Sequence, residues 1–199
     1  MKFRDLMTAP NQLTLLRMVF LPFIIIHLVA GRYFWALILF VLAGVSDGLD
    51  GLLARTLKQQ TKIGQYLDPM ADKLLLSTMF PVLSILHHIP WKYTVMVFTR
   101  DICIVVIGAT LYIAAGLRDF RPSIFGKANT FAQVAAIFFV MLFQIKHARW
   151  IWLTQTTFLH ATVAFTVVSA LHYVYLVGQR LHAASHAPAV VTKSSGDSI

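Results

Sequence analysis

The stretch from Tyr33 to Asp72 reads YFWALILFVLAGVSDGLDGLLARTLKQQTKIGQYLDPMAD. It opens with apolar residues that continue to Val45, and the first acidic residue after them is Asp47. Asp47 lies about 21 Å along a helix that starts at Tyr33, which is too short to cross a bilayer core of roughly 30 Å. We therefore expect a transmembrane helix over residues 33–57 that completes its crossing with the acidic motif.

Apolar runs of similar length recur through the rest of the chain. Of its 199 residues, 58% are hydrophobic and 13% are charged, whereas soluble domains carry about a quarter charged residues. This composition predicts an all-α integral membrane protein with six transmembrane helices, at residues 11–31, 33–57, 64–88, 91–116, 124–146 and 150–179. They form one transmembrane domain over residues 1–182. Residues 183–199 are rich in Ala, Ser and His, and we expect them to be a disordered cytoplasmic tail.

The basic residues are unequally divided between the two sides of the predicted bundle. With the N-terminus in the cytoplasm, only Arg32, Lys92, Lys146 and Arg149 of the 17 Lys and Arg residues fall on the opposite side. The positive-inside rule therefore places both termini in the cytoplasm of a multi-pass protein in the cell inner membrane or its equivalent. The net charge of +9 favours anionic lipid and phosphate-bearing substrates. Because the charges are spread over helix ends, nucleic acid is not an expected partner.

A signal peptide is the competing interpretation of the N-terminus, since Lys2 and Arg4 precede an apolar run. Polar residues interrupt that run at Asn11 and Arg17, and no small-residue cleavage site follows cleanly, so a first transmembrane helix is favoured.

The acidic residues are few and concentrated. All eight are Asp, and four of them lie within the opening stretch, as Asp47 and Asp50 and then Asp68 and Asp72. Spacings of three and four residues put each pair on one face of its helix. The second and third helices run in opposite directions, so both pairs are expected near the cytoplasmic surface. The four carboxylates can converge there in a polar cleft.

Converging carboxylates at membrane depth repel one another, and each costs a few kcal/mol. Hard divalent cations that prefer oxygen ligands, Mg²⁺ or Mn²⁺, would offset that cost, and two of them would balance four negative charges. The alternative is a set of solvated acids at helix ends, paired with Arg55, Lys58 and Lys73.

The spacing Asp-x2-Asp-Gly-x2-Ala-Arg-x8-Gly-x3-Asp-x3-Asp, which begins at Asp47 and ends at Asp72, resembles the signature of the CDP-alcohol phosphatidyltransferase family. Pro10, Asn11, Leu13 and Arg17 also look like the opening segment of that family. The resemblance covers about residues 8–180. It implies phospholipid synthesis, in which a phosphatidyl group passes from CDP-diacylglycerol to an alcohol acceptor and CMP is released.

The resemblance also implies roles for individual residues. The four Asp would hold two divalent cations, Mg²⁺ or Mn²⁺, and Asp72 would also act as the general base. The CDP part of the donor would be held by residues of the first helix and of the Asp motif, namely Pro10, Asn11, Gln12, Leu13, Gly51, Arg55 and Thr61. Arg17 has no such clear role, and snorkelling to the membrane surface explains it equally well. A homodimer is implied as well.

The acceptor is less sharply indicated. The element Gly126-Lys127-x2-Thr130-x2-Gln133 resembles both the branch that makes phosphatidylglycerol phosphate and the related cardiolipin synthases. Glycerol 3-phosphate is the favoured acceptor, because a small phosphorylated alcohol suits a cluster of basic residues; transfer to phosphatidylglycerol, as in cardiolipin synthesis, is the alternative. The candidate acceptor-binding residues are Arg100, Arg118, Arg121 and Lys127, and a positive-inside loop that touches only lipid headgroups is the competing interpretation of the last three.

Two other classes of protein remain as alternatives. A membrane prenyltransferase also uses Asp-rich helices and Mg²⁺, although its pattern lacks the Gly-x3-Asp-x3-Asp half. A non-enzymatic transporter could also have buried charges in six transmembrane spans, but its function would not require all four Asp.

Overall fold

Six α-helices make up the described parts of the chain, which are residues 9–56, 64–115 and 124–185 of a computed structural model. In chain order the helices are α1 (Ala9–Val29), α2 (Tyr33–Thr56), α3 (Gly64–Ile85), α4 (Trp91–Ala115), α5 (Ile124–Ile145) and α6 (Arg149–Ser185). The predicted all-helical fold with six helices is therefore confirmed. Helix α6 continues six residues beyond the predicted end of its span at residue 179 and enters the segment expected to be a tail. Residues 186–199 of that segment lie outside the described residues.

Two short turns, after α1 and after α3, reverse the chain. Gly31 has φ +69° after α1, where Gly31 N–H bonds to the Leu28 carbonyl and Arg32 N–H to the His27 carbonyl. The turn after α3 has the same bond pattern around His87, whose φ is +60°. Both are helix ends closed by a residue in the left-handed conformation, which satisfies carbonyls that would otherwise lack a partner.

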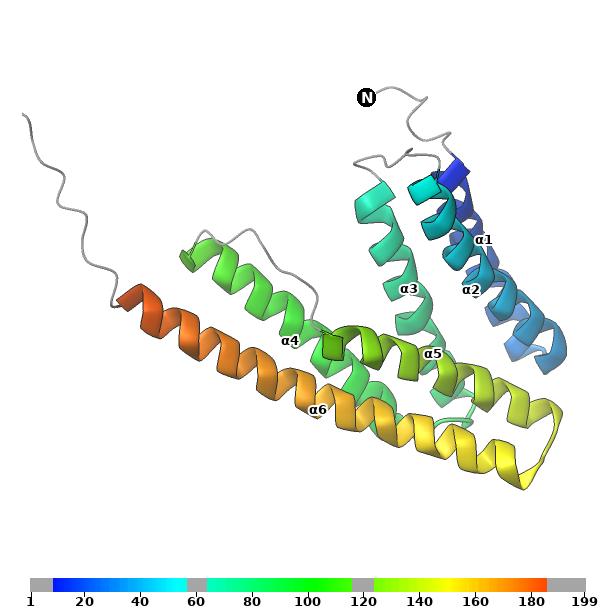
Figure 1. Ribbon diagram of the computed structural model, residues 1–199. Coiled ribbons are helices and arrows are strands. Elements are labelled where there is room, and N and C mark those ends of the chain that lie inside the picture. The colour runs from blue at the N-terminus through cyan, green and yellow to red at the C-terminus, as the bar shows by residue number, and fades with distance from the viewer. Residues whose placement is uncertain (1–8, 57–63, 116–123, 186–199) are drawn as a thin grey trace, which may run out of the picture.

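Figure 1 shows α1, α2 and α3 grouped together, with α4, α5 and α6 forming the rest of the molecule. Helix α1 packs against both α2 and α3, while α5 packs against α2, α3 and α6. Helix α4 packs on α3 and α6. Helices α3 and α5 therefore join the two groups of helices, and α1 links the two helices that carry the four Asp.

The helix surfaces are unusually apolar for a protein in water. Large side chains stand exposed on every helix, among them Phe23, Trp35, Val95, Phe131 and Trp152. Within the described residues, Gly126–Ile145 and Arg149–Ser169 are long and apolar enough to cross a membrane, and Leu16–Val29, Tyr33–Ser46 and Lys73–Ile85 are shorter apolar segments. Broad exposed apolar surface of this kind marks contact with lipid or with a partner.

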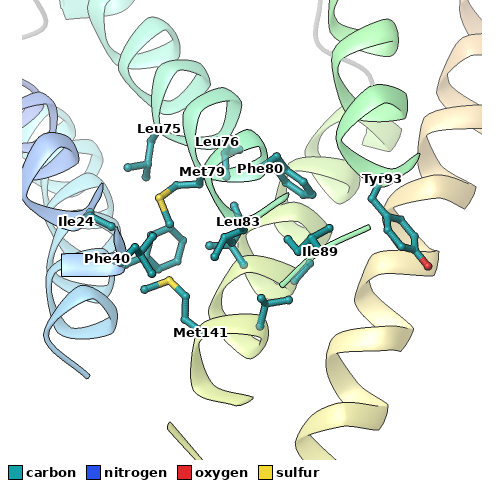
Figure 2. Close-up of a cluster of buried hydrophobic side chains, with 14 of the residues drawn as sticks. Ile24, Phe40, Leu75, Leu76, Met79, Phe80, Leu83, Ile89, Tyr93 and Met141 are labelled. Carbon is teal, nitrogen blue, oxygen red and sulfur yellow. The ribbon is translucent and has the colours of Figure 1, made fainter. Parts of the chain in front are cut away.

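A cluster of buried apolar side chains joins α1, α2, α3 and α5 (Figure 2). Helix α3 contributes more of the side chains labelled there than any other helix, including Leu75, Met79, Phe80 and Leu83, and Phe40 and Met141 approach them from α2 and α5. Positions 75, 79 and 83 recur every four residues, so they form one face of α3. The cluster starts three residues after Asp72, and it therefore fixes α3 directly beside the acidic motif.

Met79→Ala should lower the stability of the folded bundle by about 2–5 kcal/mol, because Met79 is fully buried and its removal leaves a cavity between four helices. Thermal unfolding of the protein in detergent measures this loss. Leu74→Ala on the same helix is the matched control, since Leu74 is 47% exposed and should change stability little. Equal losses in the two variants would contradict the assignment of this face of α3 to the core.

Candidate active site

The four Asp of the sequence motif lie toward one end of the molecule. Asp47 and Asp50 belong to the last part of α2, about 14 and 9 Å before its end at Thr56, taking 1.5 Å per residue. Asp68 and Asp72 lie about 6 and 12 Å after the start of α3. Figure 1 shows the end of α2 and the start of α3 at the same end of the helix group, with the two helices running in opposite directions. The two pairs therefore come to similar depths on two helices that α1 connects.

The start of α1 lies at this same end (Figure 1). Pro10 occupies the first turn of α1, where its missing N–H and fixed φ are tolerated, and Asn11, Gln12 and Leu13 follow directly after it. Gly51 and Arg55 continue the last turns of α2 beyond Asp50. The helices thus bring six of the seven expected donor-binding positions to the end that carries the four Asp. The seventh, Thr61, lies outside the described residues.

The donor set fits hard divalent cations, because four carboxylates supply oxygen ligands without a soft or imidazole ligand in the motif. Side chains are not described for these four Asp; elsewhere in the described part of the chain no group of three or more His, Cys, Asp or Glu could hold a metal ion.

A second set of charges lies between α3 and α4. Arg100 Nη1 donates a hydrogen bond to Asp101 Oδ1 at 2.9 Å, and Lys73 Nζ lies 3.8 Å from the same oxygen. The side chains of Arg100 and Asp101 are only 11% and 18% exposed, so water screens this pair weakly. One carboxylate thus faces two cations, and the surplus positive charge lies one residue from Asp72 along α3. Sequence reasoning singled out Arg100, and in the structure Lys73 and Asp101 join it in one group of charges.

The other candidate acceptor-binding residues are less completely described. Lys127 is exposed in the first turn of α5. Arg118 and Arg121 lie outside the described residues.

Three polar residues are buried although the sequence did not predict their burial. Arg17 on α1 is 1% exposed, which rules out snorkelling to the membrane surface. Asn129 and Gln133 on α5 are 0% and 4% exposed. The available signal was their spacing of four residues, which puts two amides on one face of an apolar helix.

Comparison with known proteins identifies relatives over most of the chain. The family model described as CDP-alcohol phosphatidyltransferase matches residues 7–192. A probable phosphatidylglycerophosphate synthase of Mycobacterium tuberculosis is 33% identical over 173 residues, covering 82% of this chain and 78% of the relative. A CDP-diacylglycerol–glycerol-3-phosphate 3-phosphatidyltransferase of Bacillus subtilis is 30% identical over 179 residues, covering 82% and 92%. A putative cardiolipin synthase of Mycobacterium bovis is 32% identical over 141 residues, covering 69% and 66%.

Proposed function

Because the chain belongs to the CDP-alcohol phosphatidyltransferase family, we propose that it transfers a phosphatidyl group from CDP-diacylglycerol to glycerol 3-phosphate and releases CMP. The observation that carries the proposal is the family match over residues 7–192, which spans the whole motif from Asp47 to Asp72. Relatives named for this reaction share about a third of their residues with the chain over most of its length. Membership of the family favours this activity over a prenyltransferase or a transporter.

The four Asp would hold two divalent cations, Mg²⁺ or Mn²⁺, which would neutralise the diphosphate of the donor. Arg55 and Gly51 on α2, Thr61, and the start of α1 from Pro10 to Leu13 would hold the CDP group. The guanidinium of Arg55 adds a fork of donors suited to a phosphate. In this arrangement the protein binds the donor mainly by its soluble head, and its two acyl tails stay in lipid.

Asp72 would accept the proton of the acceptor hydroxyl. The hydroxyl oxygen forms a bond to the phosphorus that bears diacylglycerol, and the bond from that phosphorus to the CMP oxygen breaks. CMP leaves with the electron pair of the broken bond. The surplus positive charge of Lys73 and Arg100, which share one carboxylate, would attract the phosphate of the acceptor, and Lys127, Arg118 and Arg121 would add to that attraction.

The same proposal includes the membrane topology. Six transmembrane spans would place both termini and the active site on the cytoplasmic side of the cell inner membrane, in one domain over residues 1–182 followed by a cytoplasmic tail. The two helices of sufficient length among the described residues and the exposed apolar helix faces support a location in the membrane. The protein would act as a homodimer.

Transfer to phosphatidylglycerol is the second candidate activity. The similarity to a protein named as a putative cardiolipin synthase supports it.

An acceptor panel separates these activities. Purified full-length protein in lipid nanodiscs is given CDP-diacylglycerol and one of glycerol 3-phosphate, phosphatidylglycerol, inositol phosphate or serine, and lipid products are identified by mass. We expect phosphatidylglycerol phosphate from glycerol 3-phosphate, at a rate at least about tenfold above any other acceptor. Cardiolipin as the main product would move the assignment to the second candidate, and no CMP release with any acceptor would refute the proposed function.

A further inference from the structure

Several polar side chains of α5 and α6, two helices that pack against each other, are buried without a hydrogen-bond partner in the described part of the chain. They are both amide atoms of Asn129 and the Nε2 of Gln133 on α5, and the hydroxyls of Thr166 and Ser169 on α6. All four residues are at most 7% exposed. Buried amides and hydroxyls are normally paired, and an unpaired one is costly. We refer to these four residues as the polar seam.

The helix registers bring Asn129, Thr166 and Ser169 to one level, and Gln133 lies about one turn further along α5. The rings of Phe139 on α5 and Phe158 on α6 stack with centroids 5.6 Å apart, and the two helices run antiparallel (Figure 1). Counting ten residues back from Phe139 reaches Asn129, and ten residues on from Phe158 reaches position 168. Equal rise along both helices therefore places Asn129 level with Thr166 and Ser169.

Arg100 comes to the same level from α4. Helices α4 and α6 run in the same direction (Figure 1), and Tyr93 Oη lies 3.4 Å from His160 Nε2. Seven residues beyond this contact, Arg100 is level with position 167 of α6. The Nε of Arg100 is also buried with no partner among the described residues. A cation that is only partly neutralised thus lies level with the amides and hydroxyls.

This grouping matches the chemistry of a phosphorylated polyol. A guanidinium binds phosphate, while amides and hydroxyls can both donate to and accept from alcohol groups. The exposed Lys127 lies two residues before Asn129, at the end of the seam where a charged ligand would approach. We propose that the polar seam binds the non-reacting hydroxyl of the acceptor, with Gln133 and Asn129 as specificity-determining residues. This inference rests on the proposed function and adds the part of the site that recognises the alcohol.

Gln133→Met is the primary test, because it removes the amide and keeps the length of the side chain. With full-length protein in nanodiscs we expect KM for glycerol 3-phosphate to rise about tenfold while KM for CDP-diacylglycerol stays unchanged. The temperature of thermal unfolding should stay equal or rise, because an unpaired buried amide has been removed. Gln155→Met is the matched control. Gln155 also has a buried unpaired oxygen in the described structure, but it lies near the start of α6, about 16 Å before Thr166 at 1.5 Å per residue, so the KM of this variant should not change.

An acceptor analogue tests the contact itself. Propane-1,3-diol monophosphate keeps the phosphate and a reactive primary hydroxyl but lacks the 2-hydroxyl. The wild-type protein should use it with a KM about tenfold above that of glycerol 3-phosphate, and Gln133→Met should no longer discriminate between the two. Ser169→Ala is a smaller change and should lose part of the discrimination between the two acceptors. It replaces Gln133→Met as the test variant if Gln133→Met does not fold.

Thermal stabilisation by ligand without donor gives a readout independent of turnover. Glycerol 3-phosphate should stabilise the wild-type protein more than inorganic phosphate, and the difference should vanish in Gln133→Met. A lower unfolding temperature with unchanged KM would overturn the inference by showing that the seam holds structural water instead. Unchanged discrimination in an active Gln133→Met protein would overturn this inference alone, whereas absence of wild-type activity would overturn the proposed function.

Discussion

Asp72→Asn is expected to lower the rate of CMP release by about a thousandfold, because general-base catalysis contributes roughly 10²–10⁴ and an amide cannot accept the proton. Asn has nearly the same size as Asp, so the first turns of α3 should keep their packing on the core that begins at Leu75. Binding of CDP-diacylglycerol should remain within a few fold of the wild-type protein. The measurements are the rate of CMP release with saturating glycerol 3-phosphate and the affinity for the donor without acceptor.

Two comparison variants make this result specific to the base. Asp197→Asn removes a carboxylate remote in sequence and should keep full activity. Asp68→Asn, at a proposed metal-binding position only, should recover part of its rate at high Mg²⁺ concentration, whereas Asp72→Asn should not. Full activity of Asp72→Asn, or its complete rescue by excess cation, would show that another group takes the proton.

The helices of this fold were predictable because each corresponds to a long apolar run of sequence that is bounded by polar residues. Gly31 and Pro90 mark turns, and the predicted ends fall within a few residues of the observed helices for α1 through α5. The positions of Asp47, Asp50, Asp68 and Asp72 along their helices follow from chain order and rise alone. Local sequence therefore determines which residues share an end of the molecule.

The contacts between helices depend on the whole bundle, and the local periodicity of the sequence gives little information about them. Nothing near Asp72 in the sequence indicates that α1 packs against both helices of the acidic motif, because that contact involves residues such as Ile24, far along the chain. The burial of Arg17 and the meeting of Lys73 with Asp101 were hidden for the same reason. The end of α6 at Ser185 was missed since the residues around Arg180 are not uniformly apolar, although they are still helical.

Removal of divalent cations is expected to abolish CMP release, with activity restored by Mg²⁺ or Mn²⁺ after the chelator is removed. Four carboxylates near one end of α2 and α3 repel one another when unneutralised, and in a weakly polar surrounding that repulsion is strong. A donor diphosphate would add further negative charge to the same place. Donor binding should therefore fail together with turnover.

Direct binding of Mn²⁺ distinguishes a metal site from a general salt effect. Equilibrium dialysis of the wild-type protein should count two Mn²⁺ ions per chain, and Asp47→Asn or Asp68→Asn should weaken at least one of them by about tenfold or more. Asp101→Asn is the matched control, because the carboxylate of Asp101 already faces Arg100 and Lys73 and has no part in the proposed quartet. Its Mn²⁺ count should stay at that of the wild-type protein. Two results would contradict the metal site: CMP release that survives chelation, or a loss of Mn²⁺ in Asp101→Asn as large as in Asp47→Asn. In either case basic side chains would have to stabilise the carboxylates of α2 and α3. The reaction would then have to proceed without these carboxylates as metal ligands.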